Sequence, residues 1–204
     1  RLRARKHREA KPLAVMVRTV EEARMFAHIG DAEAALLRTS ARPIVLVERR
    51  ANGALANAVA PGLGYVGVLL ASTPLHHLVL LAAERALVMT SGNLSEEPIA
   101  ARSDEARSRL GAIADLFLMH DRDITARVDD SVARVVEGRP LLIRRARGYA
   151  PVPLALPVAS PRALVAVGPH LKNTFTLARG GTAYVSPHIG DLDGLEGLAH
   201  FQET

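Results

Sequence analysis

The chain of 204 residues contains no cysteine and no tryptophan, and aromatic residues make up only 3% of it. Without cysteine, neither a disulfide nor a thiolate metal site can form within it. So few aromatic rings argue against a surface that stacks RNA bases. No apolar run has the length of a membrane span, and no signal-peptide pattern opens the sequence. We therefore expect no membrane partner and a cytoplasmic location.

Lysine is also scarce, because only Lys6, Lys11 and Lys172 occur among the 26 basic residues. Lysine and arginine differ at sites that need a compact, flexible point charge, so these three positions are candidates for such a role. The remaining composition is ordinary for a soluble globular protein, with 49% hydrophobic and 23% charged residues. The length suffices for one core and part of a second.

Apolar runs alternate with amphipathic stretches in the first two thirds of the chain. Buried strands are predicted at residues 13–17, 43–47, 67–70 and 87–89. Helices are predicted at residues 20–29, 31–37, 75–83 and 104–117. This alternation indicates an α/β or α+β sheet domain.

The predicted strand at residues 87–89 breaks abruptly into Thr90-Ser91-Gly92-Asn93. Ser91 and Asn93 are two residues apart, so in an extended segment their side chains point to the same side. Ligands of open α/β sheets bind outside the carboxyl ends of strands, and Gly92 allows close backbone approach. The segment therefore predicts a phosphate or nucleotide site. An ordinary strand-to-helix loop uses the same residue types and remains an alternative at this point.

A basic run opens the chain. Lys6, Arg8 and Lys11 lie where a predicted helix gives way, at Pro12, to the first strand. Three cations at such a place suit a triphosphate or an acyl phosphate. A solvated helix face explains these residues equally well.

The last quarter of the chain has a different pattern. Residues 151–161 contain four prolines and predict an extended linker. Strands are predicted at 164–168 and 173–178, followed by a two-glycine hairpin turn at residues 179–182. The loop between these strands has residue types with which several folds hold phosphate, although hairpins with lysine are common: Gly168, Lys172, Asn173 and Thr174.

No metal site is predicted. Adjacent His76 and His77 cannot share one helix face, so they are poor partners for one ion. The paired acids Asp129 and Asp130 could bind Mg²⁺, but a turn or a salt bridge to nearby arginines explains them better.

Seven segments, in order, resemble the HypF family, the carbamoyltransferases of nickel–iron hydrogenase maturation. They are Lys6–Pro12, Thr73–Leu78, Thr90–Pro98, Arg127–Val132, Arg144–Pro151, Ala166–Thr174 and His188–Leu192. The resemblance implies a YrdC-like twisted mixed sheet with flanking helices at residues 1–150, lacking its beginning. It also implies the linker at 151–161 and the first strands of an actin-like ATPase-superfamily domain at 162–204.

The resemblance implies an enzyme that uses ATP to convert carbamoyl phosphate to carbamoyl adenylate. The carbamoyl group would pass to the C-terminal cysteine of the partner HypE, as a precursor of cyanide ligands. ATP with Mg²⁺ is the implied cofactor, and zinc or another metal is implied only in parts of the full-length protein outside this chain. We expect the segment to be inactive alone.

The implied sites fall into two groups. The residues for nucleotide and carbamoyl phosphate are Lys6, Arg8, Lys11, Ser91, Asn93, Ser131, Arg144, Arg145 and Arg147. The phosphate loop of the second domain is Gly168, Lys172, Asn173 and Thr174.

Three other functions fit parts of the pattern. A tRNA threonylcarbamoyl-adenylate synthase shares the YrdC-like fold and the S-x-N pattern, but the Arg144–Pro151 segment and the actin-like opening stand against it. An antibiotic O-carbamoyltransferase would carry the two domains in the reverse order. A module that binds double-stranded RNA on a basic concave surface would show steep salt dependence without a nucleotide requirement, and it is disfavoured.

Overall fold

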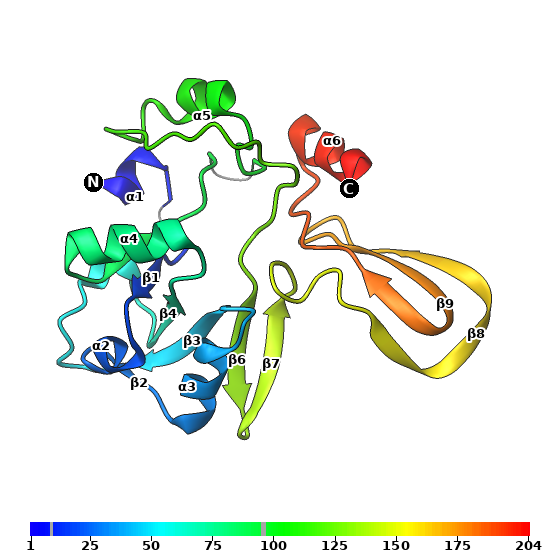
Figure 1. Cartoon of the computed structure of the whole chain (residues 1–204), viewed down its shortest axis with the longest axis horizontal. Coiled ribbons are helices and arrows are strands. Elements are labelled where there is room, and N and C mark those ends of the chain that lie inside the picture. The colour runs from blue at the N-terminus through cyan, green and yellow to red at the C-terminus, as the bar shows by residue number, and fades with distance from the viewer. Residues whose placement is uncertain (9, 95–96) are drawn as a thin grey trace. The chain divides into compact units, whose positions relative to one another are not determined.

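The computed structural model describes residues 1–8, 10–94 and 97–204, which form two compact units (Figure 1). The first unit contains residues 1–8, 91–129 and 149–204, and the second contains residues 9–90 and 130–148. Each unit therefore combines segments that are distant in the sequence. No helix of the described residues is long and apolar enough to span a bilayer.

A mixed sheet of seven strands forms the centre of the second unit. The strands are β1 (Ala14–Val17), β2 (Ala27–His28), β3 (Ile44–Arg49), β4 (Tyr65–Leu70), β5 (Leu87–Met89), β6 (Val132–Val136) and β7 (Arg139–Arg144). Their order is β5-β1-β4-β3-β6-β7, and β2 pairs with β3. The pairs β1–β4 and β3–β6 are parallel, and the others are antiparallel.

The helices of this unit begin at identifiable caps. They are α2 (Val20–Arg24), α3 (Asp31–Arg38) and α4 (Pro74–Ala83), with a short 3₁₀ turn, η1 (Asn57–Val59). At the start of α2, Thr19 Oγ1 accepts a hydrogen bond from the Glu22 amide at 3.2 Å. At the start of α4, Thr73 Oγ1 accepts one from the His76 amide at 3.1 Å, and Pro74 occupies the first turn.

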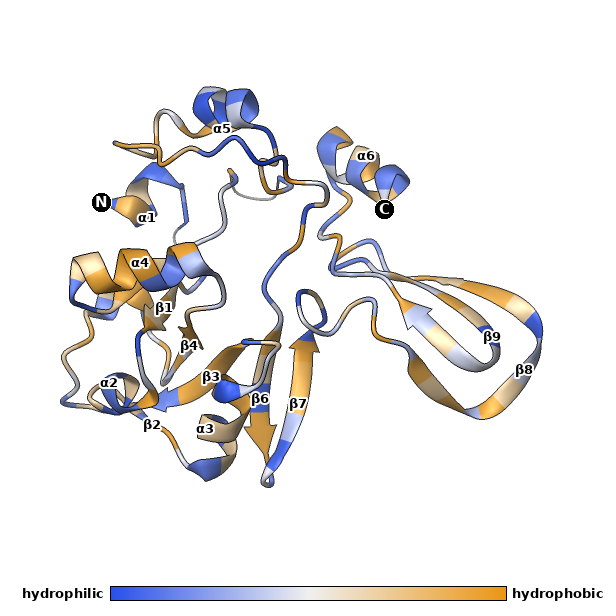
Figure 2. Ribbon diagram, in the orientation of Figure 1, coloured by the Kyte–Doolittle hydropathy of each residue, from blue (hydrophilic) through white to orange (hydrophobic). Residues whose placement is uncertain are grey.

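The core lies against both faces of the sheet. Cross-strand partners share a face, so Val15 and Val68 lie on one side and Met16 and Leu69 on the other. All four are buried, and Leu80 of α4 packs against Met16 and Leu69. Figure 2 shows α4 as mostly hydrophobic and α5 as mostly hydrophilic. Burial of this apolar surface is the main stabilising contribution to this unit.

The described residues of the first unit form three helices and a long hairpin. Its elements are α1 (Leu2–Arg5), α5 (Ser103–Leu110), α6 (Leu195–Glu203), β8 (Leu154–Val167) and β9 (Phe175–Val185). Strands β8 and β9 pair antiparallel. Phe201 of α6 meets Phe175 of β9 edge to face, with 6.3 Å between the ring centroids.

The hairpin turn predicted at residues 179–182 is wrong. These residues lie inside β9. The chain reverses between Val167 and Phe175, where a loop between two strands is predicted. The register shifts around the pair Ser160–Gly180, where Gly180 has φ +56°. The two glycines therefore lie at an irregularity in the pairing of β8 with β9. A glycine in the left-handed conformation suits such an irregularity as well as it suits a turn. Strand β8 itself begins at Leu154, within the stretch expected to form a linker.

Two predicted helices are shorter than expected. Helix α5 ends at Leu110 instead of residue 117, because Gly111 follows and Asp115 is bound by the Arg5 guanidinium at 2.8 Å. Helix α2 ends at Arg24 instead of residue 29, because Ala27 and His28 pair with β3.

Candidate functional site

Three of the predicted site residues form one hydrogen-bonded cluster in the first unit. Lys6 follows α1 and is only 3% exposed. Its Nζ donates to the Ser91 carbonyl at 2.7 Å and to Asn93 Oδ1 at 3.3 Å. Ser91 Oγ donates to the same Asn93 Oδ1 at 2.6 Å. The cluster therefore combines a buried ammonium, from the residue after α1, with a hydroxyl on a polar loop, and both groups are suited to phosphate oxygens.

This polar loop, defined as residues 91–94 and 97–100, is closed by its own backbone. The Ala100 amide donates to the Gly92 carbonyl at 2.9 Å. Asn93 Nδ2 donates to the Glu97 carbonyl at 2.7 Å. Because both ends of the Asn93 amide are engaged, Asn93 orients Lys6 and Ser91 as well as being a candidate ligand contact. Sequence reasoning identified Asn93 only as a contact.

The second unit brings together other predicted residues where β6 and β7 pair. Ser131 is fully buried, and its Oγ accepts from the Ala146 amide at 2.8 Å and donates to the Arg147 carbonyl at 3.0 Å. Arg144 Nε donates to the Asp130 carbonyl at 2.7 Å. In this structure Ser131 thus ties the chain after β7 to the start of β6.

Arg147 is held by several acceptors at once. Its guanidinium donates twice to Asp130 Oδ1, at 2.7 and 3.0 Å, and to the carbonyls of Ala41 and Arg42 at 3.2 and 3.1 Å. The salt bridge from Asp130 to a nearby arginine, which the sequence favoured over Mg²⁺, is therefore present. Four of the five N–H groups of the Arg147 guanidinium donate hydrogen bonds within the protein. A ligand could therefore accept a hydrogen bond only from the fifth.

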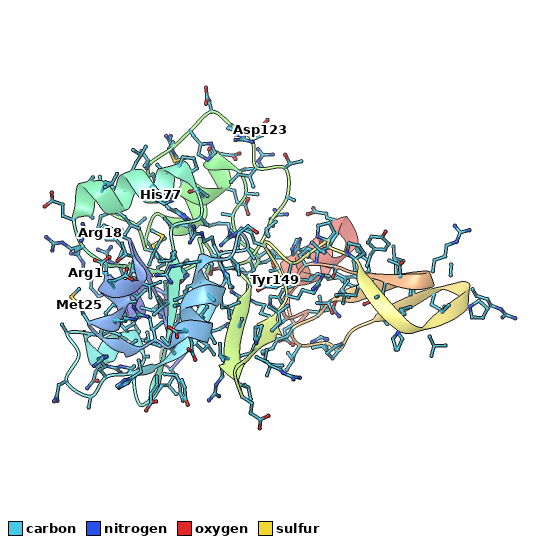
Figure 3. The ribbon with its side chains drawn as sticks, turned by 60° about the horizontal axis from the view of Figure 1, so that its bottom comes forward. Arg1, Arg18, Met25, His77, Asp123 and Tyr149 are labelled. Carbon is cyan, nitrogen blue, oxygen red and sulfur yellow. The ribbon has the colours of Figure 1, made fainter. Side chains whose placement is uncertain are left out.

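His76 lies in the same unit and was not assigned a role by sequence reasoning. It is half-buried, and its Nδ1 lies 3.2 Å from Ser72 Oγ. The next residue of α4, His77, which is labelled in Figure 3, is exposed. Burial lowers the pKa of His76, the charges of Arg147 and His77 lower it further, and Asp130 opposes the shift. The imidazole is therefore kept neutral at pH 7.

The neutral state of His76 predicts a loss of stability in acid. Its pKa is lower in the folded chain than in the unfolded chain, where it is about 6.5. Below that pH the unfolded chain binds more protons, so the free energy of unfolding decreases as the pH falls. Urea unfolding of the 204-residue chain at pH 7.5 and 5.5 should show this decrease, and His76→Gln should reduce it. Exposed His28→Gln is the control, and an equal effect of both changes would contradict the prediction.

The other predicted residues are distributed over both units. Arg8 is half-buried at the end of the first segment of the first unit, Lys11 is exposed in the second unit, and Arg145 is half-buried after β7. Lys11 therefore belongs to a different unit from Lys6. Three residues of the matched segments lie outside the described residues: Glu9, Ser95 and Glu96.

The phosphate loop predicted for the domain at residues 162–204 connects β8 and β9, and it lies in the first unit. The Gly168 amide donates to the Thr174 carbonyl at 2.8 Å, and a Cβ at Gly168 would lie 2.4 Å from that oxygen. The Lys172 amide donates to Asp191 Oδ1 at 2.6 Å. Asn173 is 2% exposed and donates to the Pro169 carbonyl at 2.7 Å, while its Oδ1 has no hydrogen-bond partner among the described residues. This oxygen can accept from a hydroxyl or bind a hard cation.

Side chains that could bind a metal ion do not cluster in the part of the chain that the structure describes. No group of three His, Asp or Glu side chains there could hold an ion. The described donors fit phosphate groups, because they are cations, hydroxyls and amides.

Two family models match the chain. The Sua5/YciO/YrdC family, described as "Telomere recombination", matches residues 1–146, and the HypF Kae1-like domain matches residues 159–204. The chain therefore belongs to the Sua5/YrdC-like family, in the HypF form in which a Kae1-like domain follows. This confirms the predicted family and the predicted fold class of a mixed α/β sheet domain.

Relatives of known name support this assignment. Carbamoyltransferase HypF of Rhizobium leguminosarum bv. viciae is 49% identical over 210 residues, which cover 100% of this chain and 27% of the relative. Carbamoyltransferase HypF of Synechocystis is 46% identical, with the same two coverages. A crystal structure of full-length HypF in its phosphate- and nucleotide-bound form matches with a TM-score of 0.94 and 43% identity, covering 99% of this chain and 27% of that one. The chain thus spans about a quarter of these relatives.

Proposed function

We propose that this chain is the part of a HypF-type carbamoyltransferase that makes carbamoyl adenylate from ATP and carbamoyl phosphate. The observation that carries the proposal is the buried Lys6 ammonium joined to Ser91 and Asn93. A buried cation beside a hydroxyl is an arrangement that stabilises the charge on transferring phosphate oxygens. The similarity to carbamoyltransferases supports the choice of a carbamoyl substrate.

The reaction needs activation because carbamate is a poor electrophile. Water first hydrolyses carbamoyl phosphate to carbamate and inorganic phosphate. A carbamate oxygen then attacks the α-phosphorus of ATP, forming a new P–O bond, while the bond to the β-phosphate oxygen breaks and pyrophosphate leaves. The resulting carbamoyl adenylate has AMP as a good leaving group.

In this reaction Lys6 would neutralise charge on the α-phosphate, and Ser91 would donate a hydrogen bond to the phosphate or the ribose. Asn93 would hold both groups in place, because its Oδ1 accepts from each of them. Arg8, Lys11, Ser131 and the Arg144–Arg147 segment remain proposed contacts to the nucleotide or to carbamoyl phosphate. Mg²⁺ bound with ATP would supply further positive charge on the phosphate oxygens.

Transfer would belong to the Kae1-like domain that begins near the end of this chain. There the thiolate of the C-terminal cysteine of HypE would attack the carbamoyl carbon, forming a thioester-like bond and releasing AMP. The loop Gly168–Thr174 would contribute phosphate contacts to that domain. Supply of cyanide ligands for hydrogenase maturation is the purpose that we propose for the product.

The test is pyrophosphate exchange into ATP by the full-length protein. Exchange should require carbamoyl phosphate. Threonine with bicarbonate should not replace it, and duplex RNA should not compete with ATP. Exchange that depends on threonine and bicarbonate would instead support a threonylcarbamoyl-adenylate synthase. Binding of duplex RNA with a steep salt dependence and no exchange would support an RNA-binding module.

A further inference from the structure

A chain of alternating charges runs through the first unit, from the polar loop to helix α6. Its members are Glu97, Arg109, Glu105, Arg127 and Glu203. Arg109 is hydrogen-bonded to both Glu97 and Glu105. Arg127 lies 3.9 Å from Glu105 and 2.8 Å from Glu203. This charge chain thus joins residues of the Sua5/YrdC-like domain to a residue of the Kae1-like domain.

The two arginines also hold the backbone of the polar loop. Arg109 Nη2 donates to the Pro98 carbonyl at 3.3 Å, and Arg127 Nε donates to the Ile99 carbonyl at 3.0 Å. Lys6 holds the other end of this loop through the Ser91 carbonyl. The loop that carries Ser91 and Asn93 is therefore fixed from both ends by cations.

Arg127 is the member that connects the two domains. One part of its planar guanidinium binds the loop, and another part binds Glu203 of α6. Its side chain is 26% exposed, whereas that of Glu203 is 63% exposed. A planar, forked guanidinium that binds two partners has little rotational freedom left. Binding to Glu203 therefore restricts the orientation in which Arg127 binds the Ile99 carbonyl. A lysine has no such fork.

We propose that Arg127 is a positioning residue through which helix α6 of the Kae1-like domain fixes the polar loop in its ligand-binding geometry. The inference rests on the proposed function of that loop. When α6 is docked, Glu203 orients Arg127, Arg127 holds the Ile99 carbonyl, and the loop keeps Ser91 and Asn93 beside Lys6. Adenylation is then favoured when the domain that consumes the adenylate is in place.

Steady-state kinetics of the full-length protein test this role. Glu203→Gln should raise the KM for ATP about threefold, because an exposed ion pair contributes little. Arg127→Lys should raise it about tenfold, since it keeps the charge and loses the bond to the loop. The kcat should change less than twofold in both, because Lys6 remains. The double change should be no worse than Arg127→Lys alone, which is the non-additivity expected of a shared interaction.

Matched controls come from helices α5 and α6, which carry other members of the charge chain. Arg107→Lys on α5 and Glu196→Gln on α6 replace exposed side chains outside the charge chain, so they should leave the KM unchanged. If Glu203→Gln and Arg127→Lys matched these controls, the positioning role would be excluded.

A readout independent of activity separates this inference from the proposed function. The Ala100 amide, which closes the polar loop onto Gly92, should exchange its hydrogen several-fold faster in full-length Glu203→Gln than in Glu196→Gln. Equal exchange rates would overturn the inference even if the enzyme is active. Absence of carbamoyl-phosphate-dependent exchange in the wild-type protein would instead overturn the proposed function, and the amide measurement would still decide the positioning role.

Discussion

Replacing Lys6 by methionine in the full-length protein should lower the rate of carbamoyl-phosphate-dependent pyrophosphate exchange by at least about a hundredfold. Loss of one preorganised group that stabilises developing charge commonly has an effect of this size. Methionine has a similar length and fills the buried position without the ammonium. Circular dichroism and thermal unfolding would show that the variant is folded. Asn93→Ala should also reduce exchange strongly, because Lys6 and Ser91 lose their common acceptor.

The matched control for Lys6 is Arg1→Met, which removes an exposed cation from the same end of the chain. We expect near wild-type exchange for this control. A folded Lys6→Met protein with undiminished exchange would mean that the ammonium only holds the loop, and that another group meets the phosphate.

Replacing Gly148 by alanine should destabilise the 204-residue chain by about 3 kcal/mol, measured by urea unfolding. Gly148 has φ +84°, a conformation that is unfavourable for alanine. A Cβ there would also lie 2.5 Å from Ala41 Cα and 2.9 Å from the Ala41 carbonyl oxygen, so backbone would have to move. That movement would disturb the contacts of Arg147 with the Ala41 and Arg42 carbonyls.

Gly138→Ala separates the two causes of this effect. Gly138 also has a positive φ, +74°, but a Cβ there would meet no atom within 4 Å. Only the backbone strain applies, so a loss of about 1 kcal/mol is expected. Equal losses at positions 138 and 148 would show that contact with Ala41 contributes nothing.

Much of the sheet could be predicted from the sequence, because its strands are continuous apolar runs. The runs around β1, β3, β4 and β5 are short, β-branched and bounded by polar or turn residues, and they form strands close to the predicted positions. The order of these strands could not be derived, because periodicity carries no information on pairing partners. The β8–β9 hairpin was misread for a related reason: two adjacent glycines suit a turn and a bulge equally well.

The candidate site was only partly accessible to sequence reasoning. The spacing of Ser91 and Asn93 predicts a site, and the family resemblance implies that Lys6 binds the same ligand. Their direct contacts with Lys6, across 85 and 87 residues, could not be predicted from the sequence. The Arg127–Glu203 pair spans 76 residues and was missed. Another part of the charge chain has a local signal in the sequence: Glu105 and Arg109 are four residues apart on α5, and such pairs commonly interact. Nothing local indicated that Arg109 also binds Glu97.

The formation of carbamoyl adenylate is most directly tested by its detection. Full-length protein at a concentration comparable to that of its substrates would be mixed with ATP and ¹³C-labelled carbamoyl phosphate, quenched within seconds and analysed by mass spectrometry. Wild-type protein should yield a ¹³C-carbamoyl adenylate that is absent with Lys6→Met. Release of AMP without any labelled adenylate, or a labelled adenylate that forms only from bicarbonate and threonine, would contradict the proposed function.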